Sequence, residues 1–170
     1  MMRCRMLVVL LALCLNACAY HLVGQGDGGV PDVIPQGATH FRIVQSRQAD
    51  EALQRMLSAF LQDKAALMVA DTVQDDAHVL VVHIEQEKET WAATSFDVNG
   101  VANQYRLSFS AQVSLMYQGK EQWHSSLPTI SGDVFAAGGA VSIEAQRASL
   151  NTSLRQQWLH RLNQQMQSGF

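Results

Sequence analysis

The chain has 170 residues, of which 48% are hydrophobic and 16% are charged. This length is typical of one domain with a substantial hydrophobic core. Twelve basic residues stand against fifteen acidic ones, so the formal net charge is −3. The acidic balance argues against a nucleic-acid-binding protein, and we expect no nucleic-acid partner.

The N-terminus has the pattern of an export signal. Arg3 and Arg5 precede an apolar run of ten residues, Met6–Leu15. Such a run is typical of a secretory signal peptide and is too short to span a bilayer as a helix, which needs about 20 residues. The run ends in Leu15-Asn16-Ala17-Cys18, which resembles the lipobox of bacterial lipoproteins. The resemblance implies cleavage before Cys18 and lipidation of its sulfur.

Two alternatives remain open for this end of the chain. One is an ordinary cleaved signal peptide, in which Cys18 stands at the boundary by chance. The other is a lipobox at Cys14, for which the preceding Leu13 is less suitable. Ala19 follows Cys18 where some lipoproteins have aspartate, and in lipoproteins this generally implies export onward to the outer membrane.

The sequence therefore predicts three parts. Residues 1–17 form a lipoprotein signal peptide, residues 18–38 a lipidated tether rich in glycine and proline, and residues 39–170 a single domain. Cleavage would remove both arginines of the signal peptide and leave ten basic residues against fifteen acidic ones. The mature chain would keep only one cysteine, Cys18, so we expect no internal disulfide.

The domain starts with a strand and a helix. The short apolar run 41–44 predicts the strand. A helix follows over about 49–63, because apolar residues recur at spacings of three and four and polar residues occupy the other face. The apolar positions of this helix are Ala49, Leu53, Met56, Leu57, Phe60 and Leu61.

A second strand begins with the β-branched run at Val79 and extends to about Trp91. Its first half is apolar, whereas its second half alternates glutamates with other polar residues, so we expect it to emerge from the core into solvent. Glu85, Glu87 and Glu89 are interpreted as a solvated acidic edge, with a cation site as the alternative. Asn99-Gly100 then predicts a hairpin turn.

The stretch from Tyr105 to Tyr117 has the clearest strand pattern. Its odd-numbered residues, Phe109 among them, are apolar or aromatic, and its even-numbered residues are polar except Met116. We expect the odd-numbered face in the core and the even-numbered face at the surface. A strand of a transmembrane barrel alternates in the same way, but a barrel needs about eight such segments and the sequence has one.

The remaining elements are a turn, a strand and a helix. Gly119-Lys120 predicts the turn, and residues 122–135 predict a fourth strand in which Pro128 favours an edge or a bulge. A final helix begins near Ser142, its expected cap, and runs to about Gln167. Its apolar stripe, which should pack on the sheet beside the first helix, consists of Ile143, Leu150, Leu154, Trp158, Leu162 and Met166.

We thus predict an α+β fold, a two-layer sandwich in which two helices pack on one face of a four-stranded, mainly antiparallel sheet. Four short motifs accompany this order of elements: Tyr20-His21-Leu22 after the lipobox, the Asn-Gly turn before Gln104-Tyr105-Arg106-Leu107, the turn at Gly119, and Trp158-Leu159-His160-Arg161-Leu162. Together with the lipobox, they resemble the LptE family. LptE is an outer-membrane lipoprotein that works with the barrel protein LptD in lipopolysaccharide assembly.

The resemblance implies a plug and assembly factor, anchored by lipid at the periplasmic face of the cell outer membrane. Such a domain sits inside an LptD-like β-barrel and helps it to fold and to deliver lipopolysaccharide, which is a second implied partner. The candidate partner-facing residues are polar positions that we expect to be exposed and short of repelling charge: Arg106, Ser108, Ser110, Gln112 and Thr129.

No residue pattern predicts catalysis, a cofactor or a metal site. The six histidines do not form a His-Glu-x-x-His motif, and no Gly-x-Ser-x-Gly motif occurs. The glycine-rich stretch 24–29 lacks the lysine and the following helix of a phosphate-binding loop. We therefore predict a protein that is not an enzyme. A lipoprotein subunit of another envelope machine is the main alternative, and a periplasmic lipoprotein enzyme is a lesser one.

Overall fold

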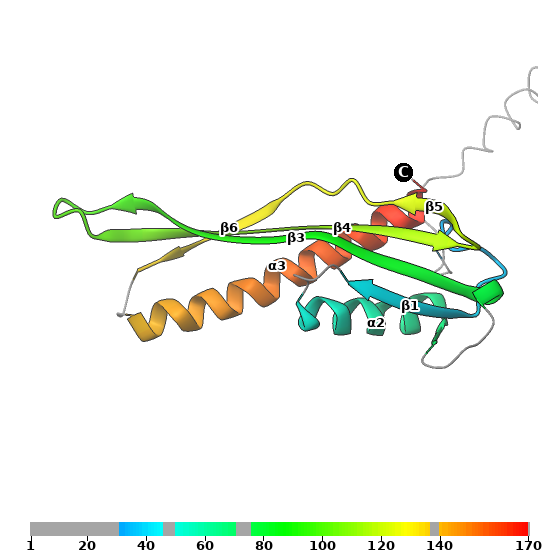
Figure 1. The fold of residues 1–170 in the computed structure, drawn as a ribbon. Helices are drawn as coiled ribbons and strands as arrows, with labels where there is room; N and C mark the ends of the chain where they lie inside the picture. The colour runs from blue at the N-terminus through cyan, green and yellow to red at the C-terminus, as the bar shows by residue number, and fades with distance from the viewer. Residues whose placement is uncertain (1–30, 46–49, 71–75, 137–139, 170) are drawn as a thin grey trace, which may run out of the picture.

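The structure is a computed structural model that describes residues 31–45, 50–70, 76–136 and 140–169. Two helices lie on one side of a single sheet (Figure 1), which confirms the predicted α+β class. In chain order the elements are β1 (His40–Gln45), α2 (Glu51–Ala65), β2 (Met68–Val69), the 3-10 turn η2 (Asp76–His78), β3 (Val79–Phe96), β4 (Ala102–Tyr117), β5 (Lys120–His124), β6 (Ile130–Phe135) and α3 (Ala140–Ser168).

The sheet is mixed and has six strands, so the prediction of four mainly antiparallel strands is wrong in this detail. The strand order is β2-β1-β3-β4-β5, and β6 also pairs with β4. β1 runs parallel to β3 because α2 lies in the crossover between them, and a helix is the usual connection between parallel strands. The two-residue β2 pairs in parallel with β1 and is too short to give a periodic signal.

The predicted fourth strand, residues 122–135, is in fact two strands. β5 pairs with one end of β4, at Ser114–Tyr117, and β6 pairs with Gln104–Phe109. Pro128 lies in the segment between them. Since proline has no N–H to donate to a strand ladder, continuous pairing along β4 is broken there.

β3 and β4 form a long hairpin that projects past the N-terminal end of α3 (Figure 1). Pairing with β4 continues to Phe96, so β3 is longer than predicted. The predicted Asn-Gly turn is present: Gly100 has a φ of +79°, and the Asp97 carboxylate accepts hydrogen bonds of 2.8 Å from the N–H groups of Asn99 and Val101. The turn at Gly119, with φ +73°, is also confirmed.

The core lies between the odd-numbered face of β4 and the two helices. From Leu107 to Leu115 every odd-numbered side chain is at most 1% exposed, which confirms the predicted faces. The Phe109 ring meets the Trp158 ring edge-on, with 6.0 Å between the centroids. Trp158 and Leu162 of α3 and Leu53 of α2 are fully buried in the same cluster.

Each helix starts at a slightly different residue than predicted. α2 begins at Glu51 and is capped by Asp50, whose carboxylate accepts a hydrogen bond from the Ala52 N–H. α3 begins at Ala140, so Ser142 lies inside the helix and does not have the predicted capping role. Its hydroxyl instead accepts a hydrogen bond from the Gln146 amide one turn later.

Residues 31–38, the last eight of the expected tether, lie against the domain. Ile34 is 6% exposed and belongs to the core cluster. Gly37 lies so close to Tyr117 that an added Cβ would be 2.6 Å from the phenol oxygen. Packing therefore holds this segment in place.

Candidate functional site

The face of the sheet opposite the helices is the candidate interaction surface. The even-numbered residues of β4 form its central row. Lys88 and Thr90 of β3 pair with Ser110 and Ser108, and Ser131 and Asp133 of β6 pair with Ser108 and Arg106 on the other side. We call this surface the open face and define it by Lys88, Thr90, Arg106, Ser108, Ser110, Gln112, Ser131 and Asp133.

Charge on the open face is largely paired. Arg106 Nε donates to Asp133 Oδ1 at 2.8 Å, and Arg106 Nη2 donates to Asp133 Oδ2 at 3.0 Å. This two-pronged hydrogen bond lowers the pKa of the Asp133 carboxyl below its ordinary value. Both groups are therefore charged and compensated at neutral pH. The rest of the central row presents hydroxyl and amide groups, which can hydrogen-bond to a partner without a large desolvation penalty.

The structure brings four of the five predicted partner-facing residues together. Arg106, Ser108, Ser110 and Gln112 follow one another along the open face of β4. Thr129 is exposed and lies just before β6. The next residue, Ile130, pairs with Phe109, so Thr129 borders the row close to Ser110.

A β-bulge in β3 creates a second polar site that the sequence did not predict. Gln86 and Glu87 together lie opposite the single residue Ala111, and Gln86 has a φ of +51°. The extra residue changes which side chains of β3 face the helices. Glu87 and Glu89 point toward α3, whereas Glu85 accepts a hydrogen bond from the Ser114 hydroxyl on the other side.

The prediction of a solvated acidic edge is therefore wrong for two of its three glutamates. The Glu87 side chain is only 6% exposed and that of Glu89 is 26% exposed. Both are compensated by basic side chains of α3. We define the Arg155 cluster as Asp50, Glu87, Glu89, Arg147, Asn151 and Arg155.

Arg155 is the centre of this cluster and is itself 7% exposed. Its guanidinium lies 2.6 Å from Asp50 Oδ2, 3.5 Å from Glu87 Oε1 and 3.8 Å from Glu89 Oε2. The Asp50 N–H also donates to Glu87 Oε2 at 2.8 Å. One arginine thus joins the start of α2, the bulge of β3 and the middle of α3.

Arg147 and Asn151 complete the cluster toward the hairpin. Arg147 lies 3.3 Å from Glu89, and Asn151 donates to the same carboxylate at 2.7 Å. The Arg147 guanidinium also lies 5.3 Å from the centroid of the Trp91 ring, and Trp91 stacks on Tyr105 with 5.0 Å between centroids. These contacts fix the projecting half of β3 to α3.

Burial and pairing shift two carboxyl groups of the cluster in opposite directions. Loss of solvation raises the pKa of Glu87 above its ordinary value of 4.5, even though the Asp50 N–H and Arg155 oppose this shift. The hydrogen bonds from the Ala52 N–H and from Arg155 lower the pKa of Asp50 below 3.8. These contacts tie the start of α2, the bulge of β3 and the middle of α3 to one another.

The sequence contains one weak indication of the Arg155 cluster. Asn151 and Arg155 continue the apolar stripe of α3 through Trp158 and Leu162, at spacings of four, three and four residues. Two polar residues on a buried stripe require partners on the opposing sheet. Without the bulge, however, the strand pattern would not place glutamates there.

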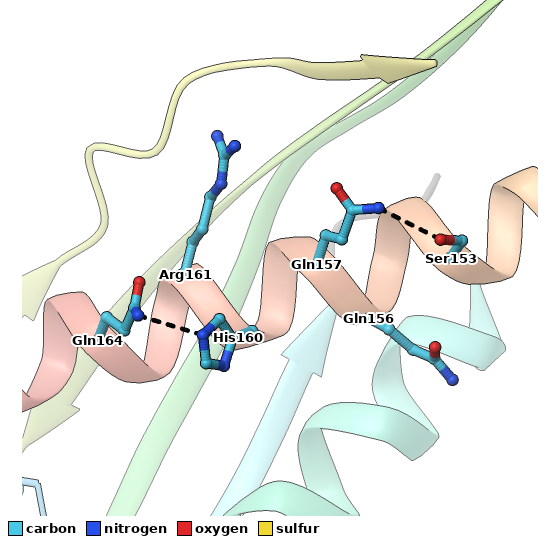
Figure 2. A pocket seen from close by; sticks show the side chains of 6 residues that line it. All are labelled: Ser153, Gln156, Gln157, His160, Arg161 and Gln164. Atoms are coloured by element: carbon cyan, nitrogen blue, oxygen red, sulfur yellow. Dashed lines mark hydrogen bonds between the residues drawn. The ribbon is translucent and has the colours of Figure 1, made fainter. Parts of the chain in front are cut away.

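A shallow depression of about 380 Å³ lies along the outer surface of α3 (Figure 2). Ser153 accepts a hydrogen bond from Gln157 at 3.2 Å, and a 3.1 Å hydrogen bond joins His160 and Gln164. All its lining residues belong to this one helix: Ser153, Gln156, Gln157, His160, Arg161 and Gln164. They spread along the helix surface and do not converge on one point, as the groups of an active site do.

The described residues contain no candidate metal site, because no three His, Cys, Asp or Glu side chains among them are grouped closely enough to hold a metal ion. No helix in the described ranges combines the length and the apolar character needed to cross a membrane. Cys18 and the predicted signal peptide lie outside the described residues, so lipidation stays a prediction.

No protein-family model matches the sequence, and no curated protein sequence matches it. Solved structures of bacterial lipoproteins do match. Rare lipoprotein B from Shewanella oneidensis has a TM-score of 0.59 and 20% identity over 76% of this chain and 95% of that one. An uncharacterized lipoprotein B from Nitrosomonas europaea has a TM-score of 0.61 and 11% identity, over 83% of this chain and 86% of that one.

A minor lipoprotein from Acinetobacter baumannii has a TM-score of 0.57 and 12% identity, and the match covers 77% of this chain and 92% of that one. The chain has the fold of these lipoproteins. At such low identity, the likeness establishes the fold and leaves the function to be argued from the residues.

Proposed function

We propose that this chain is an outer-membrane lipoprotein of the LptE type. In this proposal Cys18 anchors it at the periplasmic face, and its domain occupies and helps to assemble an LptD-like β-barrel that delivers lipopolysaccharide. The observation that carries the proposal is the combination of a lipobox-like Leu15-Asn16-Ala17-Cys18 with this particular fold. Rare lipoprotein B belongs to the LptE family, and it shares the fold along most of both chains.

The open face supports a partner with a polar surface. The interior of a large outer-membrane barrel is polar, whereas its outer surface is apolar. Ser108, Ser110 and Gln112 offer hydrogen-bonding groups of this kind, and Arg106 is already compensated by Asp133. Lipopolysaccharide, the cargo of such a barrel, is the second partner that this proposal implies.

The proposed role is binding and assembly, not catalysis, and it needs no cofactor. The polar groups on the outer surface of α3 do not converge, and the charged groups of the Arg155 cluster are engaged with one another. A lipoprotein subunit of another envelope machine is the alternative, because the same anchor and the same fold could serve a different partner.

Copurification tests the proposal directly. Full-length chain carrying a C-terminal tag, purified from gently solubilised outer membranes, should bring down a large β-barrel in near-equal amounts, because a permanent complex buries more than about 2,000 Å² and survives detergent. Depletion of the chain should lower the amount of assembled barrel and make cells permeable to large hydrophobic antibiotics. A monomeric chain, with barrel levels and permeability unchanged after depletion, would favour the alternative machine.

A further inference from the structure

The free end of the β3–β4 hairpin carries a group of exposed apolar side chains (Figure 1). Phe96 is 58% exposed, Val101 is 63% exposed and Val98, between them in the turn, is fully exposed. Phe135 at the end of β6 is 64% exposed, and it pairs with Gln104, two residues from the strand partner of Phe96. We call Phe96, Val98, Val101 and Phe135 the apolar tip. Several large apolar side chains gathered at the end of a projection indicate a contact site.

The main chain of the turn is hydrogen-bonded within itself. The Asp97 N–H donates to the Val101 carbonyl at 2.8 Å, and the Gly100 N–H donates to the Asp97 carbonyl at 3.0 Å. The N–H groups of Asn99 and Val101 both donate to the Asp97 carboxylate. The turn therefore satisfies most of its own main-chain donors without water. A segment that enters an apolar phase must have its main-chain groups satisfied internally in this way.

Charge around the apolar tip is sparse. Asp97 is the only charged residue from Thr90 to Tyr105. A charged group is costly in hydrocarbon, so Asp97 would keep the turn at the level of lipid headgroups, while Val98 reaches the acyl chains beneath them. On the β6 side of the tip, Asp133 is already paired with Arg106. The tip is thus suited to a shallow apolar contact that does not depend on charge.

Two observations favour lipid over protein as the neighbour of the apolar tip. The partner proposed for the open face has a polar surface, which does not match four apolar side chains. Four side chains also cover less than the ~800 Å² that each partner buries in a standard protein interface, which argues against a second copy held by the tip alone. Contact with lipid depends on the apolar area that is buried and requires no complementary shape.

The predicted anchor and the apolar tip lie toward opposite ends of the domain, yet both can reach one membrane. Gly37 packs on Tyr117 at the end of β4 that is remote from the tip. The 16 residues of β4 span about 50 Å. Residues 18–30, which precede the described chain, can extend over about 45 Å at most. This reach allows the domain to lie along the membrane with the tip against it.

We propose that the apolar tip inserts into the phospholipid surface of the membrane to which the chain is anchored. The inference goes beyond the proposed function, because the contact involves no barrel. Contact at both ends of the domain would restrict the orientation in which the free chain meets a partner in the membrane.

Fluorescence quenching tests the inference on the mature chain, purified from membranes and reconstituted into vesicles of phosphatidylethanolamine and phosphatidylglycerol. A nitrobenzoxadiazole dye is attached to Val98→Cys or, as a control, to Gln156→Cys on the outer surface of α3. Lipids with a spin label on the acyl chain should quench the dye at position 98 and leave the dye at position 156 bright. Iodide in the water should do the reverse. A dye at position 98 that iodide quenches and the lipids do not overturns the inference.

A matched pair of double variants separates the tip from the affinity of the dye itself for lipid. Phe96→Ser with Val101→Ser removes two exposed apolar side chains of the tip. Met68→Ser with Val69→Ser removes two exposed ones from β2, toward the other end of the sheet. All four side chains are exposed, so the melting temperatures should change little. With the dye at position 98, the first pair should lose most of the quenching by lipid and the second should keep it. Equal quenching in both overturns the inference.

The remaining outcomes identify other neighbours. High salt should change the quenching by lipid little, because no basic residue lies between Thr90 and Tyr105; loss of quenching in salt would show that a charged surface holds the chain to the lipid, and it overturns the inference. Shielding from iodide without vesicles that rises with protein concentration shows a second copy, and shielding found only in the copurified complex shows a protein partner. Either result overturns the inference. The vesicles contain no barrel, so failure of the copurification overturns the proposed function alone.

Discussion

Arg155 of α3 lies 2.6 Å from the carboxylate of Asp50, the residue that caps the N-terminus of α2. The contact joins the two helices of the layer through charge, at a place where Arg155 is 7% exposed. Glu87 is compensated by the same guanidinium. Removing Arg155 would therefore leave a buried carboxylate without its cation and would also weaken a helix cap.

We predict that Arg155→Met destabilises the domain by about 3 to 5 kcal/mol, since breaking a buried ion pair from one side leaves an uncompensated charge. Urea denaturation of a Cys18→Ala form, which lacks the anchor, measures the change. Arg161→Met on the exposed side of the same helix is the control and should change stability little. Adding Glu87→Gln to Arg155→Met should recover part of the loss; if it does not, the buried charge is not the cause.

The pH dependence of stability should report the opposite pKa shifts of the cluster. The pKa of Glu87 is raised, so the folded chain holds this proton more tightly than the unfolded chain does. Its contribution to stability is therefore present below pH 4.5 and is lost as the pH rises through the folded pKa. The pKa of Asp50 is lowered, so its contribution is present above pH 3.8 and is lost as the pH falls through the folded pKa.

Glu87→Gln removes the first of these titrations. The stability of the variant relative to the native chain should rise as the pH increases from 4.5 through the folded pKa of Glu87. Asp50→Asn, which preserves a capping side chain, should be less stable than the native chain above pH 3.8. This difference in the free energy of unfolding should shrink as the pH falls below 3.8. Denaturation at a series of pH values measures both. Parallel pH profiles for all three proteins would contradict the assigned shifts.

The two faces of β4 should respond differently to truncation. Phe109 is 1% exposed and contacts Trp158, so Phe109→Ala should cost about 3 to 5 kcal/mol. Ser110 is the next residue and lies on the open face, so Ser110→Ala should cost little in the isolated domain. Thermal melts of the two variants measure the difference. Two equally mild changes would mean that the faces are wrongly assigned.

Alternation predicted the two faces of β4, helical periodicity predicted both helices, and the glycine pairs Asn99-Gly100 and Gly119-Lys120 predicted both hairpin turns. Each of these features depends on residues close together in sequence. The parallel pairing of β1 with β3 depends instead on how a crossover helix is placed, and the split of the fourth strand depends on which part of β4 each half meets. Pro128 indicated an irregularity but did not reveal two separate strands.

The sequence pattern also could not predict the Arg155 cluster. The glutamates of β3 alternate as if they all shared one face, and only the bulge at Gln86 separates Glu85 from Glu87 and Glu89. Glutamine has no special preference for a positive φ, so the position of the bulge carries no local signal. Tertiary pairing determines it, because the bulge allows buried carboxylates to meet Arg155.

We predict that Cys18 carries the lipid anchor. Each buried CH₂ of an acyl chain contributes about 0.8 kcal/mol, so several long chains give an anchor that is effectively permanent. Mass spectrometry of the mature N-terminus should show an acylated cysteine. The described domain builds its core from Ile34 onward, so we expect Cys18→Ala to release a folded domain from the membrane. An unmodified, soluble native product would contradict the prediction.

The open face should be the surface that meets the barrel. Ser110→Asp introduces a negative charge in the middle of the row, where Lys88 pairs with it across β3 and β4, so the domain itself should tolerate the change. At the interface the same carboxylate would have to be desolvated, and the amount of copurified barrel should fall several-fold. Ser149→Asp, on the exposed side of α3, is the matched control and should leave copurification unchanged. Equal loss with both variants, or loss only with Ser149→Asp, would place the barrel against the helices instead.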